Sequence, residues 1–439
     1  MATFEELKLT KSVLKAVEEI GFTKPTPIQE QAIPIIKSGQ DLLGIAQTGT
    51  GKTAAYILPI LTQLVKAEGE NPRAIILVPT RELSIQVGED LEELAQFTNL
   101  RHAAIYGGVG WTKHAEMLAN GIDVLVATPG RLLDLYDHNV LDLKKVRTLV
   151  IDEADRMLDM GFMHQLKNIF DKLPIKRQNL LFSATFKEGV ELLTEEFLDF
   201  PVRIEVAPSA TPVEMVNQSV YHTPNFRTKL NLVSNLLKDE EEFRKVIVFC
   251  KTKLAAESVF KVIKRKSEGQ KRILHSNKGQ SARINAINSF KNDEVRILIS
   301  TDLSARGIDA SKVSHVINFD VPTNYDDYIH RIGRTARAGN QGVAITLLDP
   351  SEEWHFLKIE KIIRMRIPVL EIPSKELIAE TSQEESQIQL REIDRQRKLD
   401  DPTFQGAFHV KKNKFANSKK DTKSKSARTK PKAKKPKRK

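Results

Sequence analysis

Residues 46–53, with the sequence AQTGTGKT, combine glycines, hydroxyls and one lysine in an order that suits phosphate binding. The segment follows an apolar run that predicts a strand and precedes residues 54–64, which predict a helix. Glycines in this context let backbone N–H groups converge on phosphate oxygens at the positive end of the helix. Lys52 would then reach the β and γ phosphates, and the Thr53 hydroxyl would ligate Mg²⁺. For GTGKT alone, an ordinary glycine turn is the alternative. The expected nucleotide-binding residues of this loop are Thr48, Gly49, Thr50, Gly51, Lys52 and Thr53.

A second segment, VRTLVIDEAD at 146–155, supplies the acids that a phosphate site requires. Asp152 directly follows an apolar run and is placed to hold Mg²⁺ through water. Glu153 is placed to orient and deprotonate the water that attacks the γ phosphate. The alternative is the start of a helix, because acids are favoured in a first turn. Together the two segments predict ATP and Mg²⁺ as cofactors.

The elements that must position these residues alternate along the chain. Short apolar runs and amphipathic stretches alternate from about residue 40 to 365, which predicts repeated βαβ units and an α/β fold with parallel sheets. A helix is expected at 9–20, with Thr10 as its N-cap. The expected strands lie at 42–46, 74–79, 102–107, 123–128, 146–152, 179–184, 245–250, 271–276, 295–300, 312–319 and 342–348.

The domain organisation follows from where this alternation stops. Residues 207–215, APSATPVEM, contain two prolines and show little periodicity, so a linker is expected between two α/β domains of similar size. Beyond Pro368 the sequence becomes polar and predicts a marginally helical surface segment. The expected parts are a first domain at 1–207, a linker at 208–216, a second domain at 217–368, an extension at 369–410 and a disordered tail at 411–439.

The charge of the chain lies mostly in that tail. The 439 residues carry a formal net charge of +11, but residues 411–439 alone hold 15 Lys and Arg residues and a single acid, Asp421. Residues 1–410 have a net charge of −3. A tract of this composition cannot bury a core and predicts disorder. It predicts nucleic acid as a partner, with a nonspecific tether as one role and a solubilising tail as the alternative.

Cysteine usage and hydropathy exclude several classes of protein. Cys250 is the single cysteine, which excludes a disulfide framework and a cysteine-rich zinc module and suits a reducing compartment. No apolar run approaches the ~18 residues of a membrane span. The first ten residues carry acids where a signal peptide is basic and then apolar. We therefore expect a cytoplasmic protein without a membrane segment.

Residues 152–155 spell DEAD, and the chain resembles the DEAD-box RNA helicases over nearly all of residues 4–365. The resemblance implies two tandem RecA-like domains and an RNA-stimulated ATPase that unwinds or remodels short RNA duplexes as the domains close. Within this range, residues 21–29, GFTKPTPIQ, resemble the adenine-recognising Q motif. By resemblance, Gln29 would hydrogen-bond the base, Phe22 would pack on it, and Phe4 matches the upstream aromatic.

Further motifs of the family follow in order along the chain. Residues 183–185, SAT, resemble the element that links ATP hydrolysis to strand separation, and residues 300–309 and 330–339 resemble motifs V and VI. A γ phosphate that develops charge needs a delocalised, permanently charged donor, which arginine provides. An isolated Arg or His would instead be solvated or structural. By resemblance, Asp309 would meet the ribose, Gly307 the γ-phosphate region, Arg334 and Arg337 would be arginine fingers, and His330 would join Asp155, Ser183 and Thr185 in coupling.

A last group of motifs resembles those with which the family grips RNA. Glycines allow close approach of the backbone, and Thr and Arg side chains donate to phosphates. PTREL or TPGR alone would more readily be turns and caps. Aromatic residues make up only 6% of the chain, which favours sequence-independent backbone binding over base stacking. The expected RNA-binding residues are Pro79, Thr80, Arg81, Gly107, Gly108, Thr128, Pro129, Arg131, Gln280, Arg283 and Thr301.

Two other functions are compatible with the same motifs. One is an ATP-gated RNA clamp or assembly scaffold in which unwinding is incidental, and the other is a DNA-directed translocase. Selection of RNA over DNA depends on 2′-OH contacts that no motif displays. Residues 274–283, LHSNKGQSAR, and the basic extension resemble RhlE-like bacterial members. A monomer is expected.

Overall fold

The computed structural model describes residues 3–406 except for residues 48, 207–215, 268, 276, 302–312 and 336–341. The chain divides into two compact units, Met1–Ala379 and Glu380–Lys439. The first unit carries two β-sheets. We call the residues around the first sheet, up to 206, the first lobe, and the residues around the second sheet, from 216 to 379, the second lobe.

Seven parallel strands form the first sheet, in the order β3-β4-β2-β5-β6-β1-β7. Most of these strands are buried along their whole length, as expected for apolar strands covered on both faces. The strands are β1 (Leu42–Ile45), β2 (Ala74–Leu77), β3 (His102–Ile105), β4 (Val124–Ala127), β5 (Thr148–Ile151), β6 (Gln178–Ser183) and β7 (Val202–Glu205).

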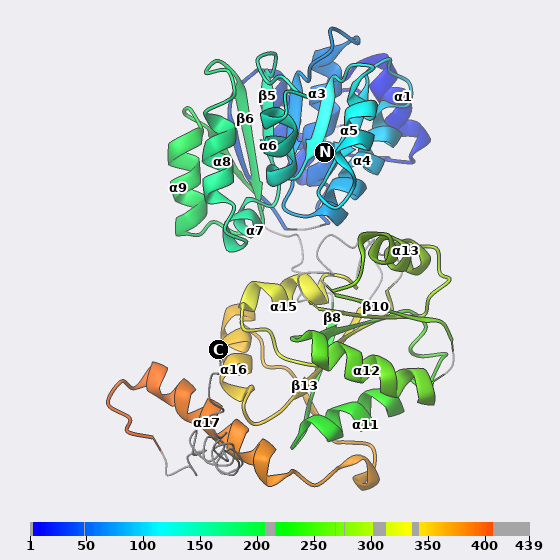
Figure 1. Cartoon of the computed structure of the whole chain (residues 1–439), viewed down its shortest axis with the longest axis vertical. Helices are drawn as coiled ribbons and strands as arrows, with labels where there is room; N and C mark the ends of the chain where they lie inside the picture. Colours follow the sequence, from blue (N-terminus) through cyan, green and yellow to red (C-terminus); the bar gives the residue numbers. More distant parts are fainter. Residues whose placement is uncertain are drawn as a thin grey trace, which may run out of the picture. The chain divides into compact units, whose positions relative to one another are not determined.

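Helices cover both faces of the first sheet, and successive strand residues face opposite cores. Ile76 packs in the core with α1 to α4, whereas its neighbours Ile75 and Leu77 pack with α6 to α9 (Figure 1). The helices of this lobe are α1 (Lys11–Glu19), α2 (Pro27–Lys37), α3 (Lys52–Leu64), α4 (Arg81–Ala95), α5 (Trp111–Leu118), α6 (Pro129–Asp137), α7 (Ala154–Asp159), α8 (Met163–Phe170) and α9 (Glu188–Phe197).

The second sheet also has seven parallel strands, in the order β10-β11-β9-β12-β13-β8-β14. One core lies against α13, α15 and α16, and the other against α11 and α12. The strands are β8 (Val216–His222), β9 (Val246–Cys250), β10 (Lys271–Leu274), β11 (Ile297–Thr301), β12 (His315–Asn318), β13 (Gly342–Leu348) and β14 (Val369–Leu370). The helices are α11 (Phe226–Leu236), α12 (Lys253–Lys266), α13 (Gln280–Lys291), α15 (Tyr325–Ile332), α16 (Glu353–Ile363) and the 3₁₀ helix η1 (Lys375–Leu377).

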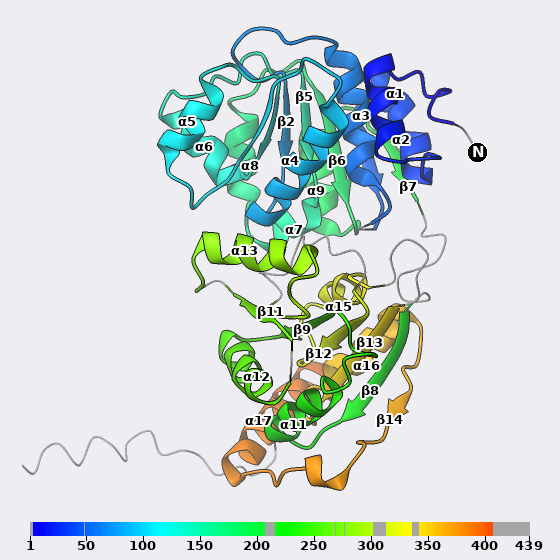
Figure 2. The ribbon, with the colours of Figure 1, turned by 90° about the vertical axis from the view of Figure 1, so that its right-hand side faces the viewer.

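The α/β class with two tandem RecA-like parallel sheets is confirmed, and every strand expected from the sequence is present. The sequence did not predict β7, β8 and β14. β7 buries one residue of four, and both residues of β14 are exposed, so neither has a strong apolar signal. They are strands because they pair with β1 and β8, and β8 in turn pairs with β13 (Figure 2).

The second unit contains the helix α17 (Gln383–Asp400), which begins after Ser382. The Ser382 hydroxyl accepts a hydrogen bond from the Glu385 N–H, as an N-cap should. No helix in the described parts of the chain is long and apolar enough to cross a membrane. Except for Val216, the expected linker at 208–216 lies outside the described residues, and so does the tail at 411–439.

Candidate active site

The phosphate-loop and acidic segments meet at the carboxyl edge of the first sheet. β6 lies between β5 and β1. The phosphate loop follows β1, Asp152 follows β5, and Ser183 ends β6. Loops that leave parallel strands at this edge are the usual place for a ligand site in α/β proteins. The sheet topology therefore brings together three segments that lie far apart in the sequence.

The phosphate loop has the backbone that its glycines predict. Gly49 and Gly51 have φ values of +84° and +90°, and Gly51 is the N-cap of α3 with no side-chain cap hydrogen bond. The first N–H groups of α3 are therefore not capped by the Gly51 position and can serve an anion. Lys52 is buried, and its Nζ donates to the Ala46 carbonyl across the loop at 2.7 Å. Thr48 lies outside the described residues.

Gln29 contacts the phosphate loop directly. Its Nε2 donates to the Gly51 carbonyl at 3.1 Å, and its Oε1 accepts the Thr26 N–H at 2.9 Å as part of a capping box on α2. A Cβ at Gly51 would lie 2.5 Å from Gln29 Nε2, so a side chain at this position would displace the Gln29 amide as well as strain a positive φ. Phe22 is 39% exposed and stacks against buried Phe4, with ring centroids 6.4 Å apart.

Asp152 is buried and oriented by two hydrogen bonds. Its Oδ1 accepts the Glu153 N–H at 2.8 Å, and its Oδ2 accepts the Tyr56 hydroxyl at 2.8 Å. Burial raises the pKa of Asp152, while the nearby Lys52 ammonium acts in the opposite direction. The carboxylate is therefore held in one orientation beside the lysine of the phosphate loop.

Glu153 lies at the start of α7 in an unusual conformation. Its φ of 53° is left-handed, which is uncommon for a residue with a long side chain. Its Oε2 accepts Arg156 Nη1 at 2.8 Å, and both side chains are buried. Backbone strain of this kind is typical of functional sites, where the surrounding structure maintains it.

Asp155 joins the DEAD segment to the SAT segment. Its Oδ2 accepts both the N–H and the hydroxyl of Thr185 at 3.0 Å, and its Oδ1 accepts the Arg156 N–H. Ser183 Oγ donates to the Thr185 carbonyl at 2.7 Å. A change at the end of β5 would therefore be transmitted to the segment after β6 through direct hydrogen bonds.

The expected RNA motifs of the first lobe also lie after strands of this edge. Thr80 caps α4, accepting the Leu83 N–H at 3.2 Å, and Thr128 is the N-cap of α6, with Pro129 in its first turn. Pro79 lies between β2 and Thr80. Turn and cap roles are therefore present, as the alternative reading of PTREL and TPGR expected.

Two arginines lie against the loop of residues 107–109, which follows β3. A Cβ at Gly108 would lie 2.2 Å from Arg81 Nη1, and one at Gly107 would lie 3.2 Å from Arg81 Nη2. Arg131 reaches the same loop, with Nη2 donating to the Val109 carbonyl at 3.0 Å and Nε to His114 Nδ1 at 3.0 Å. A side chain at either glycine would therefore displace the Arg81 guanidinium, and at Gly108 it would also strain a positive φ of 87°.

The second lobe holds part of the predicted set. Arg334 follows α15, is buried, and donates from Nε to the carbonyl of His330 at 3.0 Å. Arg283 lies in α13, Gln280 begins that helix, and Thr301 ends β11. Gly307, Asp309 and Arg337 lie outside the described residues.

Arg331 has a structural role. It is fully buried, and its Nη1 donates to the Asp320 carbonyl at 2.7 Å and to Asn318 Oδ1 at 3.2 Å. Its guanidinium lies over the Phe249 ring at 5.2 Å. This arginine of the HRIGRTAR segment therefore anchors α15 to the sheet.

Sequence reasoning missed Tyr56 and Arg156. Tyr56 lies one helical turn after Thr53, and Arg156 lies three residues after Glu153. Helical spacing of i and i+3 places such pairs on one face, and this spacing was the available signal. Neither residue type is by itself diagnostic, so the tertiary contact with Asp152 was needed to reveal Tyr56.

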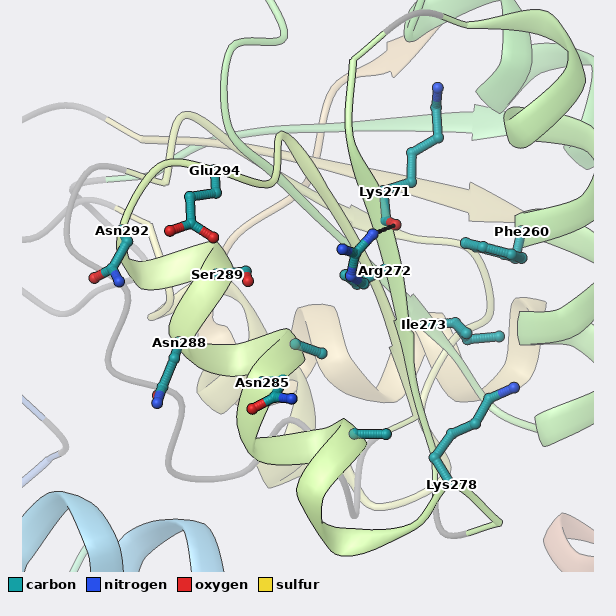
Figure 3. Close-up of a pocket in the computed structure, with 12 residues that line it drawn as sticks. Phe260, Lys271, Arg272, Ile273, Lys278, Asn285, Asn288, Ser289, Asn292 and Glu294 are labelled. Carbon is teal, nitrogen blue, oxygen red and sulfur yellow. Dashed lines mark hydrogen bonds between the residues drawn. The ribbon is translucent and has the colours of Figure 1, made fainter.

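A cavity of about 620 Å³ lies elsewhere, between α12, β10 and α13 of the second lobe. Its cations already have partners. Lys271 Nζ donates to the Gly269 carbonyl at 2.8 Å, and Lys278 Nζ donates to Glu257 at 3.1 Å. Arg272 Nη1 donates to the Lys271 carbonyl at 3.1 Å (Figure 3). With these cations engaged, nothing in the cavity identifies a ligand.

Sequence relatives agree with the geometry. A DEAD/DEAH box helicase model matches residues 26–193, and a helicase conserved C-terminal domain model matches residues 228–339. The chain is 40% identical over 372 residues to the DEAD-box ATP-dependent RNA helicase RhpA of Helicobacter pylori, covering 85% of this chain and 75% of that protein. It is 41% identical over 367 residues to the ATP-dependent RNA helicase SrmB of Escherichia coli, covering 83% and 82% respectively.

A solved structure shows the same architecture. The structure of S. cerevisiae Dbp5 bound to RNA and ADP BeF3 has a TM-score of 0.76 and 31% identity, and the match covers 85% of this chain and 96% of that one. The chain therefore belongs to the DEAD-box family of ATP-dependent RNA helicases, which are RNA-stimulated ATPases.

Proposed function

We propose that this DEAD-box helicase hydrolyses ATP at the carboxyl edge of its first sheet and couples hydrolysis to local separation of short RNA duplexes. The observation that carries the proposal is the buried group formed by Lys52, Asp152 and Glu153. Asp152 interacts electrostatically with Lys52 and accepts a hydrogen bond from Glu153. A cation that binds phosphate, an acid that binds the metal and a candidate general base are the groups that phosphoryl transfer to water requires.

ATP would be bound by the phosphate loop and the Q motif. Lys52 and the N–H groups at the start of α3 would hold the phosphates. Gln29 uses one amide proton and one oxygen lone pair within the protein. Its second proton and second lone pair remain available for the edge of adenine. Partly exposed Phe22, supported by Phe4, offers a face for the base, and Gly307 and Asp309 would meet the γ-phosphate region and the ribose.

The residues present fit Mg²⁺. Mg²⁺ in nucleotide sites uses one or two protein oxygens together with phosphate oxygens and water. Thr53 and Asp152 would provide such a pair, because Thr53 lies in the first turn of α3 after the phosphate loop and Asp152 directly follows β5 at the same edge of the sheet. The described residues contain no group of three or more His, Cys, Asp or Glu side chains suited to a metal, which is consistent with a shared protein and phosphate site. Bound there, Mg²⁺ would neutralise charge that develops on the phosphates.

Hydrolysis would depend on Glu153. Its carboxylate would orient the attacking water and accept its proton, and Arg156 would hold the carboxylate in place. Arg334 and Arg337 would stabilise charge on the γ phosphate when the lobes close. Asp155, Ser183, Thr185 and His330 would couple this event to RNA. The direct bonds between Asp155 and Thr185 support that role.

RNA is the partner of this family, and its contacts here would be largely independent of sequence. Donors at helix starts and close glycines suit a sugar-phosphate backbone. The first-lobe contacts would come from the loops after β2, β3 and β4, and the second-lobe contacts from α13 and the end of β11. The proposed RNA-contacting residues are Pro79, Thr80, Arg81, Gly107, Gly108, Thr128, Pro129, Arg131, Gln280, Arg283 and Thr301.

The setting of this activity is also part of the proposal. We expect the protein to be a monomer. We also expect it in the cytoplasm, since Cys250 is a free buried thiol, which suits a reducing compartment. The Lys-rich tail would act as an RNA tether. The RhlE-like subgroup remains a prediction.

Parallel ATPase and strand-displacement measurements test the proposal. ATP turnover should rise with structured or single-stranded RNA and far less with single-stranded DNA. A short RNA duplex should separate with ATP and more slowly with a non-hydrolysable analogue. Equal stimulation by DNA would contradict RNA as the substrate. The clamp with incidental unwinding is not favoured, because RhpA and SrmB are named as RNA helicases.

A further inference from the structure

The hydroxyl of Tyr56 contacts Asp152, one of the two residues proposed to hold Mg²⁺. Tyr56 lies in α3, one turn after Thr53, the other of these residues, and has no exposed surface. Its hydroxyl donates to Asp152 Oδ2 at 2.8 Å. A residue with no contact to solvent thus links the helix that follows the phosphate loop to the strand end that carries the acid.

The direction of this hydrogen bond follows from proton counting. A tyrosine hydroxyl has one proton, and an ionised carboxylate can only accept. Tyr56 therefore gives its proton to Asp152, and the Asp152 oxygens keep further lone pairs, which is what a cation requires of a ligand.

Asp152 gains a fixed orientation from the same contact. Its Oδ1 is held by the Glu153 N–H at 2.8 Å, and its Oδ2 by Tyr56. Tyr56 itself is fixed by packing against Phe182, with ring centroids 5.3 Å apart. The ring is anchored in the core, so the hydroxyl has a defined position.

We propose that Tyr56 is a positioning residue that prearranges Asp152 as a ligand of a Mg²⁺ site. This inference rests on the proposed function. Residues that hydrogen-bond metal ligands typically change metal affinity by about 10- to 100-fold when they are removed. Tyr56 acts through its neighbours and does not touch nucleotide.

The test is the Mg²⁺ dependence of ADP binding, measured with a fluorescent ADP analogue and the full chain. Tyr56→Phe removes one oxygen and keeps the ring that packs on Phe182. The Mg²⁺ concentration for half-maximal tightening of ADP binding should rise about tenfold. Affinity for ADP in EDTA should equal that of the parent, because the phosphate loop is unchanged.

Tyr328→Phe is the matched control. Tyr328 is also buried, and its hydroxyl donates to Gln218 Oε1 at 2.9 Å within the second lobe. This variant should show the Mg²⁺ dependence of the parent. Thermal unfolding in EDTA should show that both variants are folded, and only Tyr56→Phe should gain less stabilisation from Mg²⁺ at a fixed ADP concentration.

Three results would overturn the inference. The first is a Tyr56→Phe protein with the parent's Mg²⁺ dependence. The second is equal weakening of ADP binding with and without Mg²⁺, which would assign the hydroxyl to the nucleotide pocket or to folding. The third is the same shift in Tyr328→Phe. If the parent protein shows no effect of Mg²⁺ on ADP binding, the metal-dependent function itself is wrong, and the two failures are thereby distinguished.

Discussion

At the scale of single residues, the acids of the first lobe have separate roles because they have separate partners. Asp152 accepts hydrogen bonds from Glu153 N–H and Tyr56 and faces the phosphate loop. Glu153 is held only in part, by one bond from Arg156, so its other oxygen can serve a water molecule. Asp155 accepts a hydrogen bond from the Thr185 hydroxyl. Identical carboxylates thus have different surroundings, which suit the metal-ligand, base and coupling roles proposed for them.

Glu153→Gln should abolish ATP turnover while leaving nucleotide binding intact. A positioned general base contributes about 10²- to 10⁴-fold to a rate, so RNA-stimulated turnover should fall by that factor. The amide keeps the size of the side chain, and an RNA complex formed with ATP should persist. Steady-state ATPase and RNA-release measurements check this. Glu205→Gln, at an exposed position of β7, is the control, and parent-like hydrolysis in Glu153→Gln would disprove the assignment of the base.

Asp123 predicts a pH dependence of stability away from the active site. Its side chain is buried and pairs with Arg73 at 2.7 Å and Arg101 at 3.0 Å. Burial alone would raise the pKa of Asp123, but hydrogen bonds from Arg101, the Glu68 N–H and Arg73 outweigh burial and hold the pKa below its ordinary value. Ionised Asp123 therefore stabilises the fold above the unfolded-state pKa of about 3.9, and this stabilisation is lost as pH falls through the folded-state pKa.

Asp123→Asn should lower the free energy of unfolding by about 3 kcal/mol at neutral pH, because breaking a buried ion pair leaves buried Arg73 with only the exposed Glu68 as an acidic partner. The difference from the parent should stay constant down to about pH 5 and shrink below about pH 4. Urea unfolding across this pH range measures it. Asp171→Asn, at an exposed helix end, should have little effect, and a pH-independent loss in Asp123→Asn would show that charge is not involved.

At the scale of elements, the phosphate loop depends on both conformation and space. α2, the loop and α3 meet where Gln29 bonds to the Gly51 carbonyl. Both Gly49 and Gly51 have a positive φ, but only Gly51 has close neighbours. The Q motif thus contributes to the shape of the loop, in addition to the adenine contacts proposed for it.

Gly51→Ala and Gly49→Ala form a matched pair. Each places a Cβ on a left-handed residue at a cost of about 1–2 kcal/mol. A Cβ at Gly51 would also lie 2.5 Å from Gln29 Nε2, whereas none of the atoms compared lies within 4 Å at Gly49. ADP affinity, measured by fluorescence titration, should fall more in Gly51→Ala. Gly51→Ala combined with Gln29→Ala should recover part of the folding stability. Equal losses in the two single variants would mean that space is unimportant.

At the scale of the whole molecule, charge and catalysis are separate along the chain. Residues 1–410 have a net charge of −3, and the last 29 residues have +14. The proposed nucleotide site uses two buried acids, a buried lysine and backbone donors, all in the first lobe. RNA affinity can therefore change without a change in the chemical step.

Truncation after Val410 should weaken RNA binding and flatten its salt dependence. Each phosphate that the tail neutralises adds about 0.7 to the slope of log affinity against log salt for a single strand. ATP turnover at saturating RNA should equal that of the full chain. Fluorescence anisotropy across a salt series measures the effect. A tail of equal length with Lys and Arg replaced by Gln should behave as the truncation does, whereas unchanged affinity would leave the tail as a solubilising segment.

By itself the sequence determined the fold class, the strands with continuous apolar runs, and the identity of the phosphate loop and DEAD segments. These features depend on local order: periodicity along a strand, glycines at fixed spacing, and acids directly after an apolar run. The short or partly exposed strands β7 and β14 escaped prediction because a strand with few buried residues is defined by its partner.

Only the tertiary structure decided how the site residues act on one another. Tyr56 meets Asp152 across 96 positions of sequence, and Arg331 proved to be an anchor inside the same motif that carries Arg334. Gln29, expected at the base, also holds the phosphate loop. Hydrogen bonds between distant segments depend on sheet order and register, and neither residue type nor spacing encodes these contacts.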